Sequence, residues 1–529
     1  MKNKGFSIKA GALCMLSIAT AVAIPTNVMA EDVTLKSADG TVNLTGEFIA
    51  FEDNSYMVRT PLGDLRIAAS RVTCEGAACP VFEVAEVDVE IAGSDTVGLG
   101  LMPLLLEGFA GSVDAAATLS NSNGGTTLVA ELVSDGGFGD ELGSFLVESS
   151  GSSAAFSTLL AGEAQIGMSS RRIRPEEARA LRDSGAGNMV SPQQEHIVAV
   201  DSLVVLTHPD NPIDTLTMAQ VEGIYAGEIT NWSEVGGPDQ AISPVSMPDG
   251  SGTRSVFESR VFEDAEVNLA SNIVFADGAD DVASKVRTDV GAIGYTGYAF
   301  QRGAKPMTLI NDCGIAMTPD AFSARTEEYA LQRRLYLYTR SDVTTPQIND
   351  LLQYASSPAA DGVIAKSGFI GLGIDRKLQT LESDRASALL NPSADQYEAD
   401  FMSDMLSKMV EYDRLSTTFR FRTGSSSLDE RGRVDMERLA SYLENQPAGA
   451  EVLFVGFTDS VGAFDSNLVL SEGRAAQVMA ELQSYAGSRL GDVNISSTGY
   501  GEIAPSGCNE AEEGRRINRR VEVWINSAG

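Results

Sequence analysis

LTMAQVEGIYAGEITNWSEVGGPDQAI, from Leu216 to Ile242, lies within a long region in which strand and helix patterns alternate. The alternation extends from about Val89 to Asp375 and begins with the strand VEIAGS, followed by a helical run from Val97 to Phe109. Alternating strand and helix units favour parallel sheets covered by helices. We therefore predict an α/β domain over residues 89–375.

Four junctions between a strand and a helix in this domain carry glycine and small hydroxyl residues. Backbone N–H groups at a helix start bind anions, and hydroxyl groups add further donors. The same residue types are also ordinary helix caps, so capping remains the alternative for any single junction. Four such junctions together suit a tetrahedral oxyanion. They are GSDT at Gly93 to Thr96, SGSS at Ser150 to Ser153, GMSS at Gly167 to Ser170 and DGSGTR at Asp249 to Arg254.

Three motifs of this domain occur in one order: the stretch from Leu216 to Ile242, SGTR at Ser251 to Arg254, and GAIGY at Gly291 to Tyr295. In this order they closely resemble the phosphate-binding component of bacterial ABC transporters. The resemblance implies a two-lobed, type II periplasmic binding fold that closes on phosphate between its lobes. The ligand donors that it implies are Ser94, Thr96, Ser152, Ser153, Ser170, Ser251, Gly252 and Thr253.

Two positions depart from the pattern of that family. Met247 stands where members commonly carry an arginine, and we expect Arg254 to supply the charge instead. Ser170 stands where the family has an acid that accepts a hydrogen bond from the proton of phosphate, and Asp95 or Asp249 is the alternative acceptor. Losing the charge or the acceptor is expected to change the choice of oxyanion or to weaken binding.

A second set of motifs lies near the end of the chain. Asp459 follows the apolar strand from Val452 to Val455, and Arg474 falls in a helical pattern from about Ser466 to Leu482. An acid and a base that meet at one pocket match an amino acid with a free ammonium and a free carboxylate. The motifs are GFTDSVG at Gly456 to Gly462, LSEGRA at Leu470 to Ala475 and NRRVEVW at Asn518 to Trp524.

These three motifs resemble the OmpA C-terminal domain family, whose members bind the diaminopimelate of peptidoglycan with an Asp and an Arg. The resemblance implies that Asp459 holds the ammonium and Arg474 the carboxylate of that ligand. It also implies that Thr458 and Asn467 shape the pocket and that Arg520 supports it from behind. The alternative is that Asp459 is an ordinary turn residue and Arg474 a solvated helix charge.

The start of the chain predicts secretion. Residues 1–30 combine three lysines, an apolar run from about Ala10 to Ile24 and small residues before Glu31, which is typical of a signal peptide. We predict cleavage there and a soluble mature protein, because no later apolar segment is long enough for a membrane span. Losing the three lysines changes the formal net charge from −34 to −37. Such a charge repels nucleic acid and anionic membranes.

The remaining regions complete a multidomain prediction. Residues 31–88 show short strands and turns typical of a small all-β module, residues 376–414 a helical connector, and residues 415–529 an α+β domain. Cys74 and Cys79 are expected to form a disulfide within the first module. Cys313 and Cys508 either pair across domains or stay free.

The sequence argues against an enzyme. Its two histidines, His196 and His208, stand far apart, no phosphate-binding Walker motif is present, and no base accompanies Ser251. We expect no cofactor and no metal. The prediction is a peptidoglycan-associated periplasmic receptor of a Gram-negative bacterium, which binds phosphate or a related oxyanion for uptake or sensing.

Several points of this prediction remain open. An ABC permease or an outer-membrane protein is the expected partner, and the outer membrane is an alternative location. The alternative function is that of a structural envelope protein, which links peptidoglycan to a partner through a middle domain that does not bind phosphate tightly.

Overall fold

A computed structural model gives the architecture of the chain. The described residues are 32–526, without 38–41, 53–54, 77, 80–86, 123–124, 263–268, 344, 384, 387–395, 422–427, 429 and 492. The predicted signal peptide, residues 1–30, lies outside them. In the described part of the chain no helix has the length and apolarity that crossing a membrane requires.

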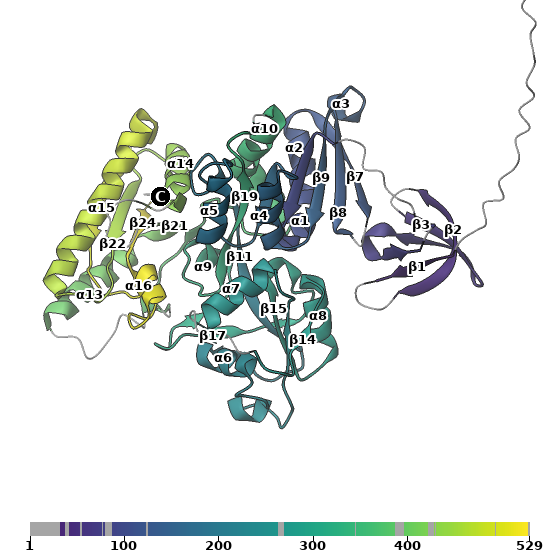
Figure 1. Cartoon of the computed structure of the whole chain (residues 1–529). Helices are drawn as coiled ribbons and strands as arrows, with labels where there is room; N and C mark the ends of the chain where they lie inside the picture. Colours follow the sequence, from purple (N-terminus) through teal and green to yellow (C-terminus); the bar gives the residue numbers. More distant parts are fainter. Residues whose placement is uncertain are drawn as a thin grey trace, which may run out of the picture.

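The first module is a five-stranded antiparallel sheet in the order β4-β3-β2-β1-β5 (Figure 1). Alternation places Val33, Leu35, Tyr56 and Val58 on its buried face, which confirms the all-β module. The predicted disulfide between Cys74 and Cys79 is present at its end. The strands are β1 (Asp32–Lys36), β2 (Asn43–Glu52), β3 (Ser55–Thr60), β4 (Gly63–Ala68) and β5 (Thr73–Glu75).

The middle region is built on one long mixed sheet in the order β14-β13-β15-β11-β19-β10-β6-β9-β8-β7, with β16 paired to β11. The pairs β10–β6, β6–β9, β13–β14 and β13–β15 are parallel, as alternating strands and helices predict. The strands are β6 (Val89–Gly93), β7 (Ala115–Ser122), β8 (Thr127–Val133), β9 (Glu141–Ser149), β10 (Ile166–Ser169), β11 (Glu195–Thr207), β13 (Ser243–Ser246), β14 (Val274–Phe275), β15 (Ala292–Gly297), β16 (Lys305–Pro306) and β19 (Gln332–Thr339).

The strand β11 joins two lobes. Its first part, through Ser202, pairs with β19, and its second part, from Leu203, pairs with β15. The first lobe carries α1 (Asp95–Gly100), α2 (Met102–Ser112), α3 (Ser134–Gly137), α4 (Ser152–Ala161), α5 (Pro175–Asp183), α10 (Pro346–Ser356) and α11 (Asp361–Lys366). The second lobe carries α6 (Met218–Ala226), α7 (Gly252–Val261), α8 (Ala279–Thr288) and a small sheet of β12 (Thr215–Thr217), β17 (Thr308–Ile310) and β18 (Ala316–Met317). The helix α9 (Ala321–Arg325) leads from the second lobe back to β19.

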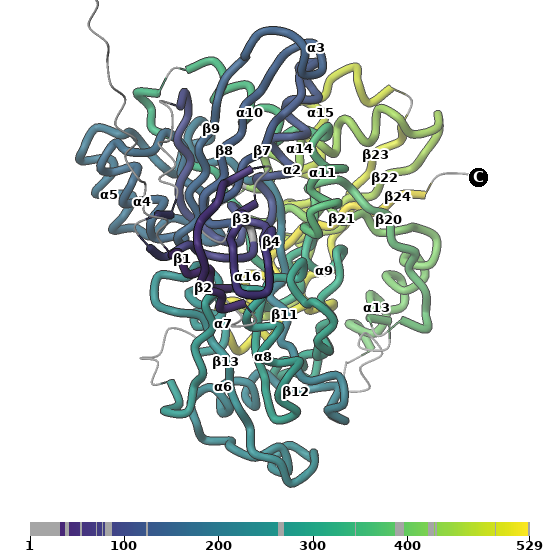
Figure 2. The backbone as a smooth tube through the Cα atoms, turned by 90° about the vertical axis from the view of Figure 1, so that its right-hand side faces the viewer, coloured from purple at the N-terminus to yellow at the C-terminus, as the bar shows by residue number. Residues whose placement is uncertain are grey.

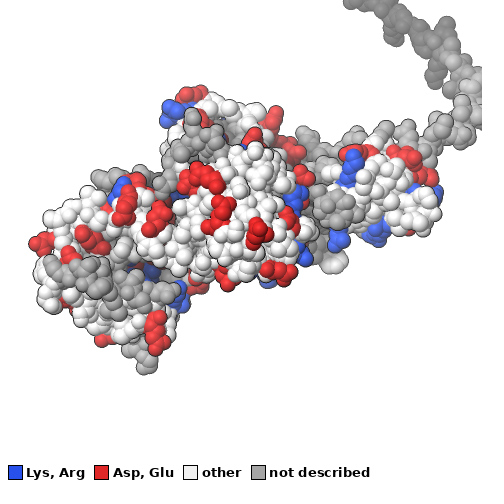
Figure 3. Space-filling view, turned by 90° about the horizontal axis from the view of Figure 1, so that it is seen from below, with Lys and Arg blue, Asp and Glu red and all other residues white. Residues whose placement is uncertain are grey.

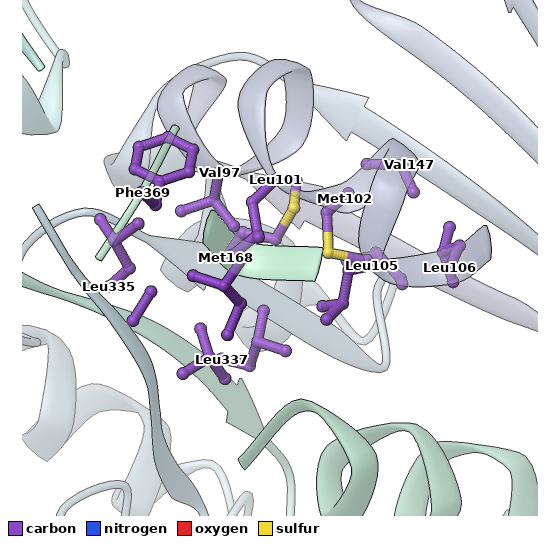
Figure 4. Packing of buried hydrophobic residues seen from close by; sticks show 14 of the residues in the cluster. Val97, Leu101, Met102, Leu105, Leu106, Val147, Met168, Leu335, Leu337 and Phe369 are labelled. Atoms are coloured by element: carbon purple, nitrogen blue, oxygen red, sulfur yellow. The ribbon is translucent and has the colours of Figure 1, made fainter. Parts of the chain in front are cut away.

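The core of the first lobe fixes the start of α1 at the carboxyl end of β6. Leu101, Met102 and Leu105 from the α1–α2 segment pack with Met168 of β10 and Leu337 of β19 (Figure 4). All five are essentially without exposure. This packing holds the strand-to-helix junction at residues 93–96 in place.

The C-terminal domain has a sheet in the order β20-β21-β24-β22-β23, flanked by helices. The predicted connector is partly strand, because β20 pairs with β21 of this sheet, and partly helix, because it contains α13. The elements are β20 (Arg376–Lys377), α13 (Gln396–Met409), β21 (Asp413–Arg420), α14 (Glu430–Glu444), β22 (Glu451–Gly456), α15 (Phe464–Ala486), β23 (Asn494–Gly499), α16 (Glu512–Asn518) and β24 (Arg520–Asn526).

The C-terminal domain lies against the two-lobed region (Figures 1 and 2). A disulfide joins Cys313 of the second lobe to Cys508 of the C-terminal domain, which settles the pairing that the sequence left open. Acidic side chains spread over the surface seen from below, with fewer basic ones between them (Figure 3). That surface agrees with the acidic composition.

Candidate binding sites

Two helices from opposite lobes begin close together where the lobes meet, at a place that we call the cleft. Ser152 starts α4 of the first lobe, and Ser251 caps α7 of the second, its Oγ accepting from the Arg254 N–H at 3.3 Å. A Cβ added to Gly252 would lie 2.1 Å from Ser152 Oγ and 2.4 Å from Ser170 Oγ. Glycine is therefore required at this position for the two helix starts to approach so closely.

The hydroxyl groups at the cleft contact one another across the lobes. Thr96 Oγ1 and Thr253 Oγ1 lie 3.2 Å apart, and Arg174 of the first lobe donates to Ser255 Oγ of the second at 3.1 Å. The lobes are thus closed. Thr96 and Thr253 are fully buried, so their hydroxyls stand in a low-dielectric site where hydrogen bonds to an anion are strong.

The predicted donors of the first lobe have different hydrogen-bond partners. Ser152 Oγ lies 3.1 Å from Ser170 Oγ and also accepts from the Ser170 N–H at 3.0 Å. Ser94 caps α1 by accepting from the Val97 N–H, which leaves its own hydroxyl hydrogen for another acceptor. Ser153 is turned toward Arg171, which donates to its Oγ at 3.4 Å.

Arg333 on β19 contacts the buried hydroxyls of Thr96 and Thr253. Its Nη1 donates to Thr253 Oγ1 at 2.6 Å and its Nη2 to Thr96 Oγ1 at 3.4 Å. Asp201 of β11 pairs with the same guanidinium at 2.7 Å, and both side chains are almost completely buried. Sequence reasoning missed Arg333, although a charge at an inward position of an apolar strand was a usable signal.

Arg254 lies at the cleft but is engaged elsewhere. Its guanidinium pairs with Asp249 and Glu258, both at 2.7 Å, and lies over the ring of Phe275. Met247 is fully buried, and its sulfur accepts from Ser251 Oγ at 3.3 Å. The charge expected from Arg254 is thus offset by two carboxylates.

The two alternative proton acceptors have different surroundings. The Asp249 side chain is 96% exposed and paired with Arg254. Asp95 lies beside Thr96 at the start of α1, and within the described part of the chain its Oδ1 is buried without a hydrogen-bond partner. Burial raises the pKa of the Asp95 carboxyl.

A second site is a pocket of about 280 Å³ in the C-terminal domain. Asp459 reaches it from the loop after β22, and Arg474 reaches it from α15. The pocket therefore brings the predicted acid and base together. Its lining residues are Thr458, Asp459, Val461, Asn467, Leu470, Arg474, Glu512, Arg515 and Arg519.

Arg474 lines this pocket and carries a buried nitrogen, Nη1, without a hydrogen-bond partner among the described residues. Its guanidinium lies 5.2 Å from the ring centre of Phe421. Burial, followed by the charge of Arg519, lowers the pKa of Arg474. A carboxylate ligand would relieve both penalties.

Asp459 has an internal partner that the sequence did not indicate. Its Oδ1 accepts from the Val461 N–H at 3.1 Å, and its Oδ2 pairs with Arg519 at 2.8 Å. Arg519 also pairs with Glu512 at 3.0 Å. Asn467 Nδ2 donates to the Asp459 carbonyl at 3.3 Å and thereby fixes the loop.

Arg520, the other arginine of this motif, lies outside the pocket lining and is fully buried. It donates to Glu522 and to the Ala504 carbonyl, both at 2.8 Å, and stacks over Phe457. Burial opposes ionisation of Glu522, but the arginines around it, with Arg385 and Arg414 contributing most, lower its pKa to about 2. Arg520 is thus part of a buried charge cluster with Glu522, Arg385 and Arg414.

The fold and the cleft define a two-lobed binding protein extended by a C-terminal domain. The chain belongs to the PBP superfamily, whose domain profile matches residues 85–364, and the OmpA family profile matches residues 420–519. The predicted combination of a phosphate-binding-type domain with an OmpA domain is therefore confirmed.

Parts of the chain are similar to known proteins. The chain is 28% identical over 227 residues to the phosphate-binding protein PstS of Bacillus subtilis, covering 42% of this chain and 70% of that protein. It is 29% identical over 197 residues to PstS of Staphylococcus epidermidis, covering 36% of this chain and 58% of that protein. A phosphate-bound structure of a putative phosphate ABC transporter substrate-binding protein from Clostridium perfringens is 26% identical, with a TM-score of 0.42, and the match covers 54% of this chain and 98% of that one.

Proposed function

We propose that the chain is a peptidoglycan-anchored periplasmic receptor of a Gram-negative bacterium that binds phosphate or a related oxyanion between its lobes. The observation that carries this proposal is the meeting of the α4 and α7 starts with buried hydroxyls from both lobes. Backbone N–H groups at two converging helix starts suit a tetrahedral anion. The relatives named as phosphate-binding proteins support the same ligand.

The charges at the cleft favour an oxyanion that carries a proton. Arg333 and Asp201 together are neutral, so Arg333 orients Thr96 and Thr253 more than it adds net positive charge. A carboxylate at Asp95 would repel a fully ionised anion but accepts a hydrogen bond from a protonated one. Phosphate and arsenate keep a proton at neutral pH and sulfate does not, so phosphate and arsenate are the favoured ligands.

The second half of the proposal is attachment to the wall. Arg474 offers an unused donor for a carboxylate, and Asp459 lies in the same pocket for an ammonium. A diaminopimelate end with both groups free matches this pair. The receptor would then be stationary and would pass its anion to an ABC permease, or report it to an outer-membrane protein.

Titration calorimetry of the secreted chain with phosphate, arsenate and sulfate tests the receptor. Heat with phosphate and arsenate is expected, and absence of heat with every oxyanion would reject the proposal. Gly252→Ala should abolish binding, because its Cβ would collide with Ser152 and Ser170. Gly362→Ala on α11 is the matched control, since its Cβ meets nothing within 4 Å.

Retention on purified sacculi tests the anchor. The secreted chain should bind, and the double variant Asp459→Ala with Arg474→Ala should be released. Undiminished retention of the double variant would reject this pocket as the wall-binding site.

The alternative is a structural envelope protein whose middle domain mediates contacts. Met247 in place of an arginine and the offset charge of Arg254 favour it. Retention on sacculi without oxyanion binding would select this alternative.

A further inference from the structure

The C-terminal domain contacts both lobes of the binding protein. On the first lobe, Arg438 of α14 pairs with Asp361 of α11 at 2.8 Å and donates to the Ser356 carbonyl at 3.0 Å. On the second lobe, Glu513 of α16 pairs with Arg260 in the last turn of α7. The domain therefore contacts both lobes along one side of the two-lobed region, through α14 and α16 (Figure 1).

A covalent bond reinforces the contact with the second lobe. Cys508 stands just before α16, and it is joined to Cys313 in the loop between β17 and β18. A Cβ added to Gly514 of α16 would lie 2.0 Å from the Cys508 carbonyl, so the helix is packed directly on the disulfide-bonded segment. Movement of the second lobe thus moves α16 with it.

The C-terminal domain also contacts the segment between α9 and β19, which leads from the second lobe to the first. Glu327 is buried and pairs with Arg516 of α16 at 3.2 Å, while Glu328 pairs with Arg414 of β21 at 2.7 Å. Burial opposes ionisation of both acids, but the surrounding arginines lower the pKa of each. These carboxylates therefore stay charged and paired near neutral pH.

The helix α16 connects the two candidate sites. Glu512 and Arg515 on one side of it line the wall-binding pocket, and Arg519, the next residue after it, holds Asp459. On its other side Glu513 holds Arg260. Arg260 lies in the last turn of α7, the helix whose first residues stand at the cleft.

We propose that the C-terminal domain is a clamp that holds the two lobes closed and couples the wall-binding pocket to the cleft through α16 and α7. A domain that contacts both lobes must lose contacts with one of them when the lobes separate, so these contacts stabilise the closed arrangement. Release of a bound anion requires opening, and the clamp slows it. The clamp rests on the proposed function only for the identity of the ligands.

Amide hydrogen exchange of the ligand-free secreted chain tests the clamp directly. Three variants are compared with the parent chain: Arg260→Gln, Glu513→Gln, and a double variant that combines Cys508→Ser with Cys313→Ser. Each should speed exchange over residues 252–261 by about fivefold or more, in the usual range of coupling between sites. Asp280→Asn is the control, because it removes an exposed ion pair of the second lobe with Arg302, which leaves α16 untouched.

Exchange in β22 and β11 of the same samples shows whether each variant is folded. Unchanged exchange over residues 252–261 in folded clamp variants would overturn the proposal. If the variants exchange faster but the parent chain binds no oxyanion, the clamp is supported and the receptor function is rejected. If the variants exchange as the parent does and the parent binds phosphate, the receptor function is supported and the clamp is rejected.

Addition of meso-diaminopimelate tests the coupling. In the parent chain it should change exchange over residues 252–261, and in Glu513→Gln that response should be lost. A response of equal size in Glu513→Gln would show that α16 does not transmit the effect. Absence of any response in a parent chain that binds sacculi would reject the coupling between the two sites.

Discussion

Arg519 donates to Asp459 at 2.8 Å, while Arg474 in the same pocket keeps a buried nitrogen without a partner among the described residues. The pocket is therefore asymmetric before any ligand arrives. A ligand carboxylate would meet Arg474, whereas a ligand ammonium would share Asp459 with Arg519. Affinity should accordingly depend most on the guanidinium of Arg474.

Arg474→Lys should weaken binding of meso-diaminopimelate about tenfold, because the lysine keeps the charge but loses the planar fork that holds a carboxylate. Calorimetry of the secreted chain measures the loss. Arg489→Lys is the matched control, since Arg489 pairs with Glu437 and Glu444 outside the pocket. Equal affinity of Arg474→Lys and the parent would contradict a bidentate contact.

Asp95→Asn should narrow the preference for phosphate over sulfate by about tenfold or more, because an amide no longer requires a proton on the ligand. The ratio of the two dissociation constants is the measurement. Asp249→Asn is the control, as Asp249 is exposed and paired with Arg254. If the ratio changes in Asp249→Asn and not in Asp95→Asn, Asp249 is the acceptor of the hydrogen bond from the phosphate proton.

How far the sequence predicted these sites depends on the distance between the residues involved. Ser251, Gly252 and Thr253 stand together in a short motif, and the motif alone placed them at a helix start. Arg333 is 80 positions from Thr253 and 237 from Thr96, so only the folded sheet brings them together. A motif reports local backbone geometry and carries no information on such a pairing.

The adjacent arginines 519 and 520 illustrate a different limit. The family resemblance implied that Arg520 supports the pocket from behind, and β24, which begins at that residue, directs it into the buried cluster with Glu522. Arg519, one position earlier, holds Asp459. Successive residues of a strand point to opposite faces, so a shift of one residue exchanges their surroundings. A sequence pattern does not locate the start of a strand to within one residue.

Arg333→Met should destabilise the two-lobed region by about 3–5 kcal/mol, because Asp201 would remain as a buried carboxylate without its partner. Thermal unfolding of the secreted chain measures the change. The double variant with Asp201→Leu should recover much of the stability while failing to bind phosphate. Recovery of binding in the double variant would mean that Arg333 does not orient the cleft hydroxyls.

The interface between the C-terminal domain and the second lobe should weaken in acid. Burial opposes ionisation of Glu513, but Arg516 and Arg260 outweigh it and lower its pKa to about 2 from 4.5. A carboxylate whose pKa falls on folding stabilises fully above its unfolded pKa, and that contribution is lost as the pH falls toward the folded pKa. The difference in melting temperature between the parent and Glu513→Gln should therefore be largest above about pH 5 and shrink toward about pH 2. Glu228→Gln controls for the change of an exposed carboxylate, and a Glu513→Gln difference that stays constant across this range would show that the ion pair does not stabilise the interface.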